Sequence, residues 1–275
     1  MLKTEMRNPN TIHIDKMSTT DMLKAINDEN MNAVKAVEKE LPNIAEAVEA
    51  ASKALEKGGR IFYIGCGTSG RLGVLDASEC PPTFGVPYGR VVGIIAGGDR
   101  CLRYAAENEE DIKEEGIKDL KEYNITADDV VIGISAAGGA AYVLGAIEYA
   151  AEKGCTTVGI TSNADSQLDR ISNISICPDT GAEAVTGSTR MKAGTAQKII
   201  LNMLSTCAMI KQGYVYENLM INLKPANIKL RDRSIRITSE LSGADMKTAE
   251  DALEQSDWEI RKAVDMLKKY KYTKD

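Results

Sequence analysis

Ile-Phe-Tyr-Ile-Gly-Cys-Gly-Thr-Ser-Gly-Arg-Leu-Gly-Val-Leu-Asp-Ala-Ser-Glu-Cys-Pro-Pro, residues 61–82, is the stretch that decides the fold. Its apolar start, residues 61–64, leads into a glycine-rich turn, and a helix-compatible run follows over residues 71–77. Proline inside a helix removes a hydrogen bond and clashes with the preceding turn, so Pro81 and Pro82 predict that this helix ends before them. The stretch therefore predicts a strand, a loop and a helix.

The glycine-rich turn has two interpretations. Its glycines, Gly65, Gly67 and Gly70, let the backbone approach a ligand closely. Thr68 and Ser69 add hydroxyls beside the free N–H groups at the start of a helix, an arrangement that suits phosphate. Alternatively, the small residues only allow tight packing, and the spacing alone does not decide. The turn is neither a P-loop nor a dinucleotide motif, because no Gly-Lys-Ser/Thr follows and Gly70 comes one residue too early.

The central part of the chain alternates short apolar runs with amphipathic helical segments. This order predicts a doubly wound α/β fold with a mostly parallel, five-stranded sheet. Ligands in such sheets bind at the carboxyl ends of the strands, where we expect the glycine-rich turn. The predicted strands are residues 61–64, 91–95, 130–134, 156–160 and 174–177, and the predicted helices are 71–77, 99–121, 140–153 and 167–171.

The flanking segments complete a predicted division into three parts. These are an N-terminal arm with helices over 1–58, the α/β domain over 59–225, and a three-helix domain over 226–275. The arm is residues 1–17, which lack periodicity. Further predicted elements are helices at 18–26, 31–40, 44–57 and 189–213, a strand or extended tail at 219–225, and helices at 228–241, 245–255 and 258–270.

Composition excludes several classes of function. A net charge of -6 without a basic stripe argues against binding to nucleic acid. Six dispersed cysteines without a Cys-x-x-Cys pair, and no export signal, predict a cytoplasmic protein with reduced thiols. No apolar run approaches the roughly 20 residues that span a membrane. His13 is the only histidine, so we expect no histidine triad or zinc site, and acid–base chemistry must use carboxylates, lysines or tyrosines.

Three motifs resemble those of one family. Residues 65–85, Ile-Ala-Gly-Gly at 95–98 and Thr-Gly-Ser-Thr-Arg-Met-Lys-Ala-Gly-Thr-Ala-Gln-Lys at 186–198 are similar to motifs of the N-acetylmuramic acid 6-phosphate etherases, members of the sugar isomerase (SIS) superfamily. The resemblance runs in register from about Thr19 to beyond Lys224. It implies a cytoplasmic homodimer in cell-wall recycling, without a metal or organic cofactor. The implied substrate is a phosphorylated amino sugar, N-acetylmuramic acid 6-phosphate, whose D-lactyl ether is cleaved to give N-acetylglucosamine 6-phosphate and D-lactate.

The resemblance also implies two catalytic carboxyl groups. Cleaving the ether requires a base that removes a proton beside the open-chain aldehyde and an acid that protonates the departing oxygen. Glu79 matches the general acid of the family motif and Glu110 the general base, with Glu107 as the alternative base. Glu79 must then stay protonated near neutral pH through burial or a nearby negative charge. The alternative for a glutamate near a helix end is a solvated surface position.

The implied phosphate ligands lie in two clusters. Thr68, Ser69 and Gly70 form the first, and Ser188 and Thr189 form a second hydroxyl cluster before the long helix. The nearby basic side chains, Arg190 and Lys192, either bind the substrate or form structural ion pairs.

The loop after the third predicted strand departs from the family pattern. The family usually has Ala-Ser-Gly-Arg-Thr-Pro-Tyr, whose two hydroxyls help to hold phosphate, whereas residues 136–142 read Ala-Ala-Gly-Gly-Ala-Ala-Tyr. A hydrogen bond to a charged group contributes about 1.5–3 kcal/mol, so losing two weakens phosphate binding by about a hundredfold or more. The remaining candidates are Ser135 and the backbone N–H groups of Gly138 and Gly139.

Two other functions stay open. A phosphosugar-binding regulator would keep the pocket without turnover. An aldose–ketose isomerase needs no acid aimed at an ether oxygen, so the Glu79 motif counts against it. The C-terminal helices resemble a small domain related to ubiquitin-associated domains, here shorter than usual, and they either bind a partner or only pack.

Overall fold

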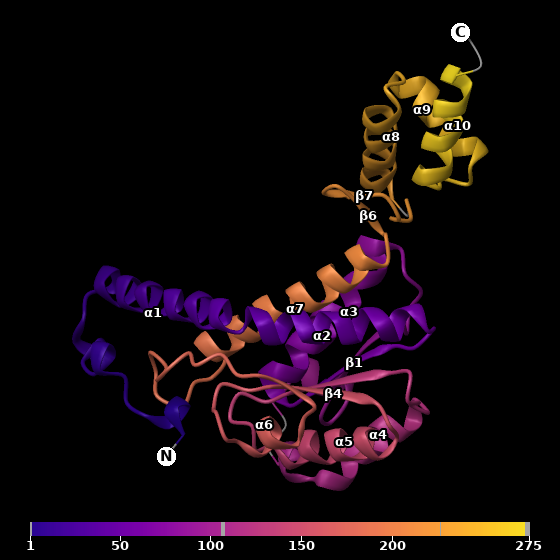
Figure 1. The fold of residues 1–275 in the computed structure, drawn as a ribbon. Coiled ribbons are helices and arrows are strands. Elements are labelled where there is room, and N and C mark those ends of the chain that lie inside the picture. The colour runs from indigo at the N-terminus through magenta and orange to yellow at the C-terminus, as the bar shows by residue number, and fades with distance from the viewer. Residues whose placement is uncertain (1, 106–107, 226, 273–275) are drawn as a thin grey trace. The chain divides into compact units, whose positions relative to one another are not determined.

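The computed structural model describes residues 2–105, 108–225 and 227–272, and Figure 1 shows its helices and strands. The chain divides into two compact units. The first contains Met1–Ser78 and Gly89–Ala208, and the second contains Glu79–Tyr88 and Met209–Asp275. The division into 1–58, 59–225 and 226–275 stays a prediction.

The first unit is built on a five-stranded sheet in the order β2-β1-β3-β4-β5. Every pairing in it is parallel, which confirms the predicted doubly wound α/β fold. The chain adds strands on one side of β1 and then on the other, so the topological switch point lies at the carboxyl ends of β1 and β3. The strands are β1 (Ile61–Gly65), β2 (Val91–Ile95), β3 (Val130–Ile134), β4 (Thr156–Ile160) and β5 (Ile174–Ile176).

Helices cover both faces of the sheet (Figure 1), as expected for parallel strands that are buried on both sides. Phe62 and Ile64 belong to the core on one face, with residues of α4 (Lys113–Glu122), α5 (Ala141–Glu152) and α6 (Gln167–Ile171). Tyr63 faces α3 (Gly67–Phe84) on the other. A Cβ at Gly73 of α3 would lie only 2.9 Å from the Tyr63 Cβ, so this helix packs closely because that position is glycine.

Helix α3 is longer than the predicted 71–77, because it begins at Gly67, within the predicted loop, and continues through Pro81 and Pro82. The prediction that these prolines end the helix is wrong. Proline in a helix interior costs about 3 kcal/mol. Burial of a stripe along the helix outweighs this local penalty. The buried residues of the stripe are Ala77, Cys80 and Phe84.

The predicted single helix over 99–121 is also wrong. The described residues of this segment form η4 (Asp99–Leu102), η5 (Glu109–Asp111) and the start of α4. Asn108 has a φ of 74° and Ile112 is extended, and either conformation interrupts an α-helix. Like charges at Glu110 and Glu114, one turn apart in a continuous helix, add a further penalty.

The N-terminal segment is docked on the first unit by hydrogen bonds. The Asn8 amide donates to the Ala182 carbonyl at 2.9 Å, and the Thr11 hydroxyl donates to the Ala184 carbonyl at 2.8 Å. The segment contains three single turns, η1 (Lys3–Glu5), η2 (Pro9–Thr11) and η3 (Ile14–Lys16).

One helix, α1 (Thr19–Lys39), replaces the two predicted over 18–26 and 31–40. The polar stretch between them stays helical because Glu29 within it is buried and forms an ion pair with Lys192. Helix α2 (Leu41–Glu56) follows and contacts the sheet.

The second unit contains the three predicted C-terminal helices around a core of their own. Gly243 has a left-handed conformation that ends the first helix, and the Asp245 carboxylate caps the next one. Of the predicted strand over 219–225, only β7 (Leu219–Met220) forms, paired with β6 (Val215–Tyr216). The helices are α8 (Ile228–Ser242), α9 (Met246–Gln255) and α10 (Ile260–Tyr272).

Candidate active site at the carboxyl ends of the strands

Three loops meet at the carboxyl edge of the sheet. In the sheet register, Gly65 at the end of β1 pairs with Ile95 of β2 and with Ile134 of β3. The loops after these strands are therefore neighbours, and two of them flank the topological switch point. This places the glycine-rich turn and the Ser135–Ala140 loop at the same edge.

The glycines of the turn serve both interpretations made from the sequence. A Cβ at Gly70 would lie 2.5 Å from the Gly65 carbonyl oxygen, so these two glycines allow close packing of strand and helix. A Cβ at Gly67 would meet no atom within 4 Å, so close packing does not require glycine there. Its φ of 52° is the reason, because glycine adopts this backbone conformation without strain. Gly67 itself is exposed, Thr68 is half-buried, and Ser69 and Gly70 are buried.

Thr68 and Ser69 lie beside the start of α7 (Lys192–Lys211). The Ser69 hydroxyl donates a hydrogen bond to the Gln197 carboxamide oxygen at 3.0 Å. A Cβ at Gly194 would lie 3.3 Å from the Thr68 methyl carbon and 3.4 Å from the Thr189 carbonyl oxygen. The two hydroxyl clusters predicted from the sequence are therefore near each other.

Lys192 is buried, with a side chain only 2% exposed. Its ammonium group forms an ion pair with the Glu29 carboxylate. Burial raises the pKa of Glu29, but hydrogen bonds from Asn10 and Lys192 outweigh it, so the pKa lies below its ordinary value. Lys192 therefore forms a structural ion pair, which is one of the two roles predicted for it. The other role, binding of the substrate, stays a prediction.

The first turn of α7 already has an anionic partner. The fully buried Glu183 carboxylate accepts hydrogen bonds from the backbone N–H groups of Lys192 at 3.0 Å and Ala193 at 2.9 Å. The half-buried Ser188 and Thr189 precede this capped turn, and Arg190 is exposed. An anion at this end of α7 must therefore rely on the hydroxyls, because Glu183 occupies two of the helix N–H groups.

The Ser135–Ala140 loop is closed by its own hydrogen bonds. The Gly138 N–H donates to the Ser135 carbonyl at 3.0 Å and to its hydroxyl at 3.1 Å. Gly138 has a φ of 72°, and a Cβ there would lie 2.2 Å from the Ser166 hydroxyl oxygen. The Gly138 N–H is thus already used within the loop, whereas Gly139 is exposed with open space around it.

A cavity of about 340 Å³ opens beside the glycine-rich turn, lined by Cys66, Arg71, Glu110 and neighbours from 96–111. Burial raises the pKa of the Cys66 thiol to about 12, and the charges of Glu110 and Asp111 add to this. The Arg71 guanidinium donates to the carbonyls of Leu102 and Tyr104, both at 3.1 Å, and so fixes the loop over the cavity.

The two predicted catalytic carboxyl groups fall in different units. Glu110 lies in η5 of the first unit, is exposed and lines the cavity. Glu79 is exposed on the C-terminal half of α3, at the start of the second unit. Glu107, the alternative base, lies outside the described residues. The catalytic roles of all three stay predictions.

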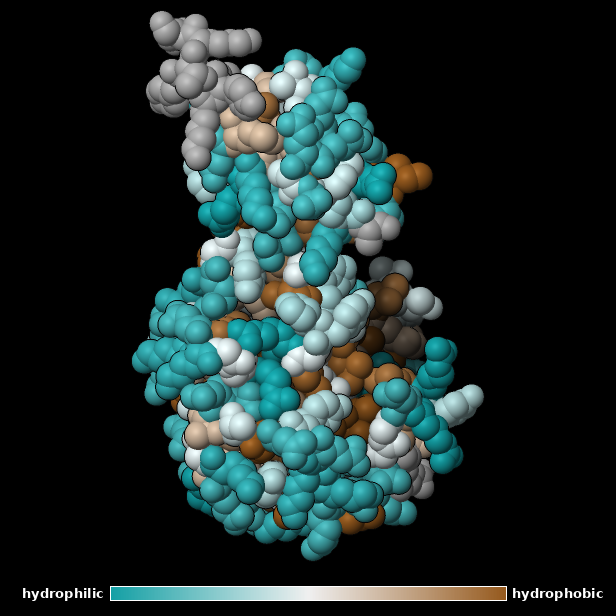
Figure 2. Space-filling view, turned by 90° about the vertical axis from the view of Figure 1, so that its right-hand side faces the viewer, coloured by the Kyte–Doolittle hydropathy of each residue, from teal (hydrophilic) through white to brown (hydrophobic). Residues whose placement is uncertain are grey.

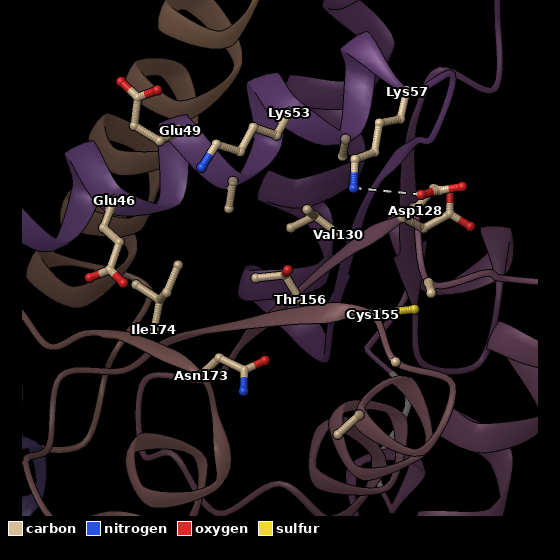
Figure 3. A pocket seen from close by; sticks show the side chains of 16 residues that line it. Glu46, Glu49, Lys53, Lys57, Asp128, Val130, Cys155, Thr156, Asn173 and Ile174 are labelled. Carbon is tan, nitrogen blue, oxygen red and sulfur yellow. Dashed lines mark ion pairs between the residues drawn. The ribbon is translucent and has the colours of Figure 1, made fainter.

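A larger cavity, about 640 Å³, lies at the opposite edge of the sheet, at the amino ends of β3, β4 and β5. Figure 3 shows Lys53 and Lys57 of α2 reaching over it, with Lys57 in a 3.9 Å ion pair with Asp128. The switch point favours the carboxyl edge as the candidate active site, despite the greater size of this cavity.

Sequence reasoning missed three residues of the site. Gln197 accepts a hydrogen bond from Ser69, Glu183 caps the first turn of α7, and Arg71 fixes the loop beside Glu110. Arg71 and Gln197 both stand within the motifs quoted above, so their motif membership was the available signal. Among the described residues, no group of histidine, cysteine or acidic side chains is arranged to hold a metal ion. Nor is any described helix long and apolar enough to cross a membrane.

Two family models match the chain. The model of the glucokinase regulatory protein N-terminal SIS domain matches residues 43–151, and the SIS domain model matches residues 112–207. Curated relatives match almost the whole chain. The N-acetylmuramic acid 6-phosphate etherase of Yersinia pestis (strain Pestoides F) is 52% identical over 268 residues, which cover 98% of this chain and 91% of the relative. The etherase of Yersinia pseudotuberculosis serotype O:3 (strain YPIII) gives the same values.

Solved structures share the fold. A phosphoheptose isomerase from Francisella tularensis matches with a TM-score of 0.54 and 19% identity over 70% of this chain and 100% of that one. A phosphoheptose isomerase from Neisseria gonorrhoeae matches with a TM-score of 0.52 and 18% identity, over 70% of this chain and 99% of that one. At this identity the likeness concerns the arrangement of strands and helices alone.

Proposed function

This chain belongs to the N-acetylmuramic acid 6-phosphate etherase family, and we propose that it cleaves the D-lactyl ether of N-acetylmuramic acid 6-phosphate. The products are N-acetylglucosamine 6-phosphate and D-lactate, which makes the protein a carbon–oxygen lyase. The single observation that carries this proposal is the 52% identity to curated etherases over almost the full chain.

The proposed reaction proceeds by elimination and then hydration. Glu110 as general base removes the proton on the carbon next to the open-chain aldehyde, and Glu79 as general acid protonates the lactate oxygen as its bond to the sugar breaks. Water then adds to the unsaturated sugar with the two roles reversed. Well-placed acid–base groups contribute about 10²–10⁴ each in rate, so two carboxyl groups suffice without a histidine.

We place the phosphate at the switch point, between the glycine-rich turn and the Ser135–Ala140 loop. Supporting this are the exposed Gly67 at the start of α3 and the nearness of the two hydroxyl clusters, with Thr68, Ser69 and Gly70 in one and Ser188 and Thr189 in the other. Ser135 and Gly138, in the loop after β3, stay predicted ligands of the phosphate, and the Gly138 N–H is bonded to Ser135 in this structure. Lys192, which pairs with Glu29, stays a predicted substrate-binding residue at the start of α7.

The altered loop supports a second candidate function, a phosphosugar-binding protein without turnover. Ala137, Gly139 and Ala140 stand where the family usually has Ser, Arg and Thr, so the loop lacks two hydroxyls and a positive charge. This candidate predicts that a phosphosugar raises the thermal midpoint while no lactate forms.

Purified protein incubated with N-acetylmuramic acid 6-phosphate, with lactate measured enzymatically, tests the proposal. We expect lactate release that Glu79→Gln and Glu110→Gln each reduce by about 10²–10⁴. Glu109→Gln, which changes the neighbouring carboxylate at the same cavity, is the matched control and should keep most of the activity. Absence of lactate at high enzyme concentration, together with stabilisation by the phosphosugar, would favour the second candidate.

We further propose that the protein works as a homodimer in the cytoplasm. Figure 2 shows hydrophobic surface gathered on one side of the larger part of the molecule in that view. Helix α1 extends beyond the sheet (Figure 1) and carries exposed apolar side chains on one stripe, Leu23, Met31 and Val34. A second copy would cover such side chains. Sedimentation equilibrium tests this, and a monomer at micromolar concentration would contradict it.

A further inference from the structure

We propose that Gln197 is a positioning residue that directs the Ser69 hydroxyl toward the phosphate of the substrate. This inference rests on the proposed function, because it takes Ser69 as a ligand of that phosphate. Gln197 itself does not touch the substrate in this account. It acts by controlling which way the single Ser69 proton points.

The two side chains form an isolated buried pair. Ser69, on α3, is 8% exposed, and Gln197, on α7, is 1% exposed. The Ser69 hydroxyl donates to the Gln197 carboxamide oxygen at 3.0 Å. The Gln197 amide nitrogen is buried and has no hydrogen-bond partner among the described residues. A buried N–H group without a partner is unfavourable and rare in folded proteins.

The observed hydrogen bond from Ser69 to Gln197 leaves the Ser69 hydroxyl unsuited to binding an anion. A serine hydroxyl has one proton to donate and otherwise offers only lone pairs. While that proton is shared with Gln197, Ser69 presents a lone pair to a phosphate oxygen, and the two repel. Ser69 becomes a phosphate ligand only when its proton is released from Gln197.

A half-turn of the Gln197 carboxamide accomplishes this release. Oxygen and nitrogen of the amide exchange places within nearly the same volume, so the packing of α3 against α7 does not change. The amide nitrogen then donates to the Ser69 oxygen, and the Ser69 proton points toward the phosphate. The partnerless atom becomes the amide oxygen, and an under-satisfied buried carbonyl is tolerated more readily than an N–H group.

The resulting chain of hydrogen bonds runs from Gln197 to Ser69 to phosphate. Each bond in such a chain polarises the next, so the hydroxyl is a stronger donor than serine alone. The geometry therefore makes the contribution of Gln197 to phosphosugar affinity wholly dependent on the presence of the Ser69 hydroxyl.

A double-mutant cycle tests this dependence. The variants are Ser69→Ala, Gln197→Met and the pair combined, with affinity for N-acetylglucosamine 6-phosphate measured by calorimetry and kcat and KM for lactate release measured beside it. We expect Ser69→Ala to weaken binding by about ten- to hundredfold. Gln197→Met should weaken it by roughly fivefold or more, and by less than about twofold when Ser69 is already alanine. Unphosphorylated N-acetylglucosamine should show no difference among the variants.

Ser205→Ala is the matched control, since Ser205 is another buried α7 hydroxyl bonded to α3, at Asp76 with a distance of 3.2 Å. It should lower stability without changing phosphosugar affinity. Gln197→Glu adds a second test. Its carboxylate keeps the Ser69 proton and repels phosphate, so binding should fall more than in Gln197→Met.

The outcomes are distinguishable. Equal losses from Gln197→Met with and without the Ser69 hydroxyl would overturn this inference while leaving the proposed function intact. So would Gln197→Glu binding as tightly as the wild type. Failure of the wild type to bind the phosphosugar at all would overturn the proposed function and, with it, this inference.

Discussion

The buried ion pair between Glu29 and Lys192 should be a major source of stability for the first unit. The perturbation is Glu29→Gln, which keeps the shape of the side chain but removes its charge. The Glu29 side chain is 6% exposed and Lys192 only 2%, so the substitution leaves a buried ammonium group without its counter-ion. Asn10 also donates to the Glu29 carboxylate at 2.8 Å.

Breaking such a pair costs about 3–5 kcal/mol in the free energy of unfolding, because the remaining charge stays buried. We expect the lower end, about 3 kcal/mol, since the pair borders a cavity of about 380 Å³ that gives water access. Urea unfolding followed by far-ultraviolet circular dichroism measures the change. Glu38→Gln, on an exposed position of the same helix, is the control and should stay within about 0.5 kcal/mol of the wild type.

The pH dependence of this difference has a definite sign. The pKa of Glu29 is lowered in the folded protein, so its contribution is present above the unfolded pKa, about 4.3, and is lost as the pH falls through the folded value. The wild type and Glu29→Gln should therefore converge in acid. A change below about 0.5 kcal/mol at pH 7 would refute the reasoning, as would a difference that grows on acidification.

Three further outcomes follow from individual contacts. Gly138→Ala should destabilise the protein by more than about 1 kcal/mol in urea unfolding, because φ at Gly138 is 72° and the new Cβ would lie 2.2 Å from the Ser166 hydroxyl oxygen. Gly139→Ala, in open space, is the control and should be nearly neutral, so equal effects of the two substitutions would contradict this prediction. Burial raises the pKa of Asp76, and hydrogen bonds from Asn202 and Ser205 only partly offset this. The contribution of Asp76 to the free energy of unfolding is therefore full below its unfolded pKa and falls as the pH rises. Asp76→Asn should gain stability relative to the wild type from about pH 4 upward, and unfolding free energies of the two proteins that change with pH in parallel would contradict this. The half-buried Cys66 thiol, with a pKa raised to about 12, should react with iodoacetamide at pH 7.5 much more slowly than the exposed Cys207. Peptide mass spectrometry measures the two rates, and preferential labelling of Cys66 would contradict the raised pKa.

Local pattern was sufficient for the strands of the sheet and for two of the helices between them, α5 and α6. Strands β2, β3 and β4 begin and end where the apolar runs do, and α6 occupies residues 167–171 as predicted. These elements obey local rules because each apolar run is short and bounded by turn residues. The C-terminal helices were equally predictable, since Gly243 and Asp245 give local signals for a stop and a start.

Contacts between residues distant in sequence account for what local pattern missed. The α3 prolines are accommodated by buried side chains on their helix, which outweigh a local penalty. Helix α1 is continuous because Glu29 forms an ion pair with Lys192, which lies 163 residues away in the sequence. Gln197 reaches Ser69 across 128 residues, so no periodicity in the sequence connects them. Thr68 and Ser69 were suggested by the glycine-rich turn itself, whereas Glu79 and Glu110 came from motif resemblance.

The measurement that tests the central claim most directly is the reaction of N-acetylmuramic acid 6-phosphate in water enriched in oxygen-18, with both products analysed by mass spectrometry. Elimination followed by hydration predicts one solvent oxygen in N-acetylglucosamine 6-phosphate and none in the lactate. Label in the lactate would contradict the proposed route, and the absence of both products would contradict the proposed function.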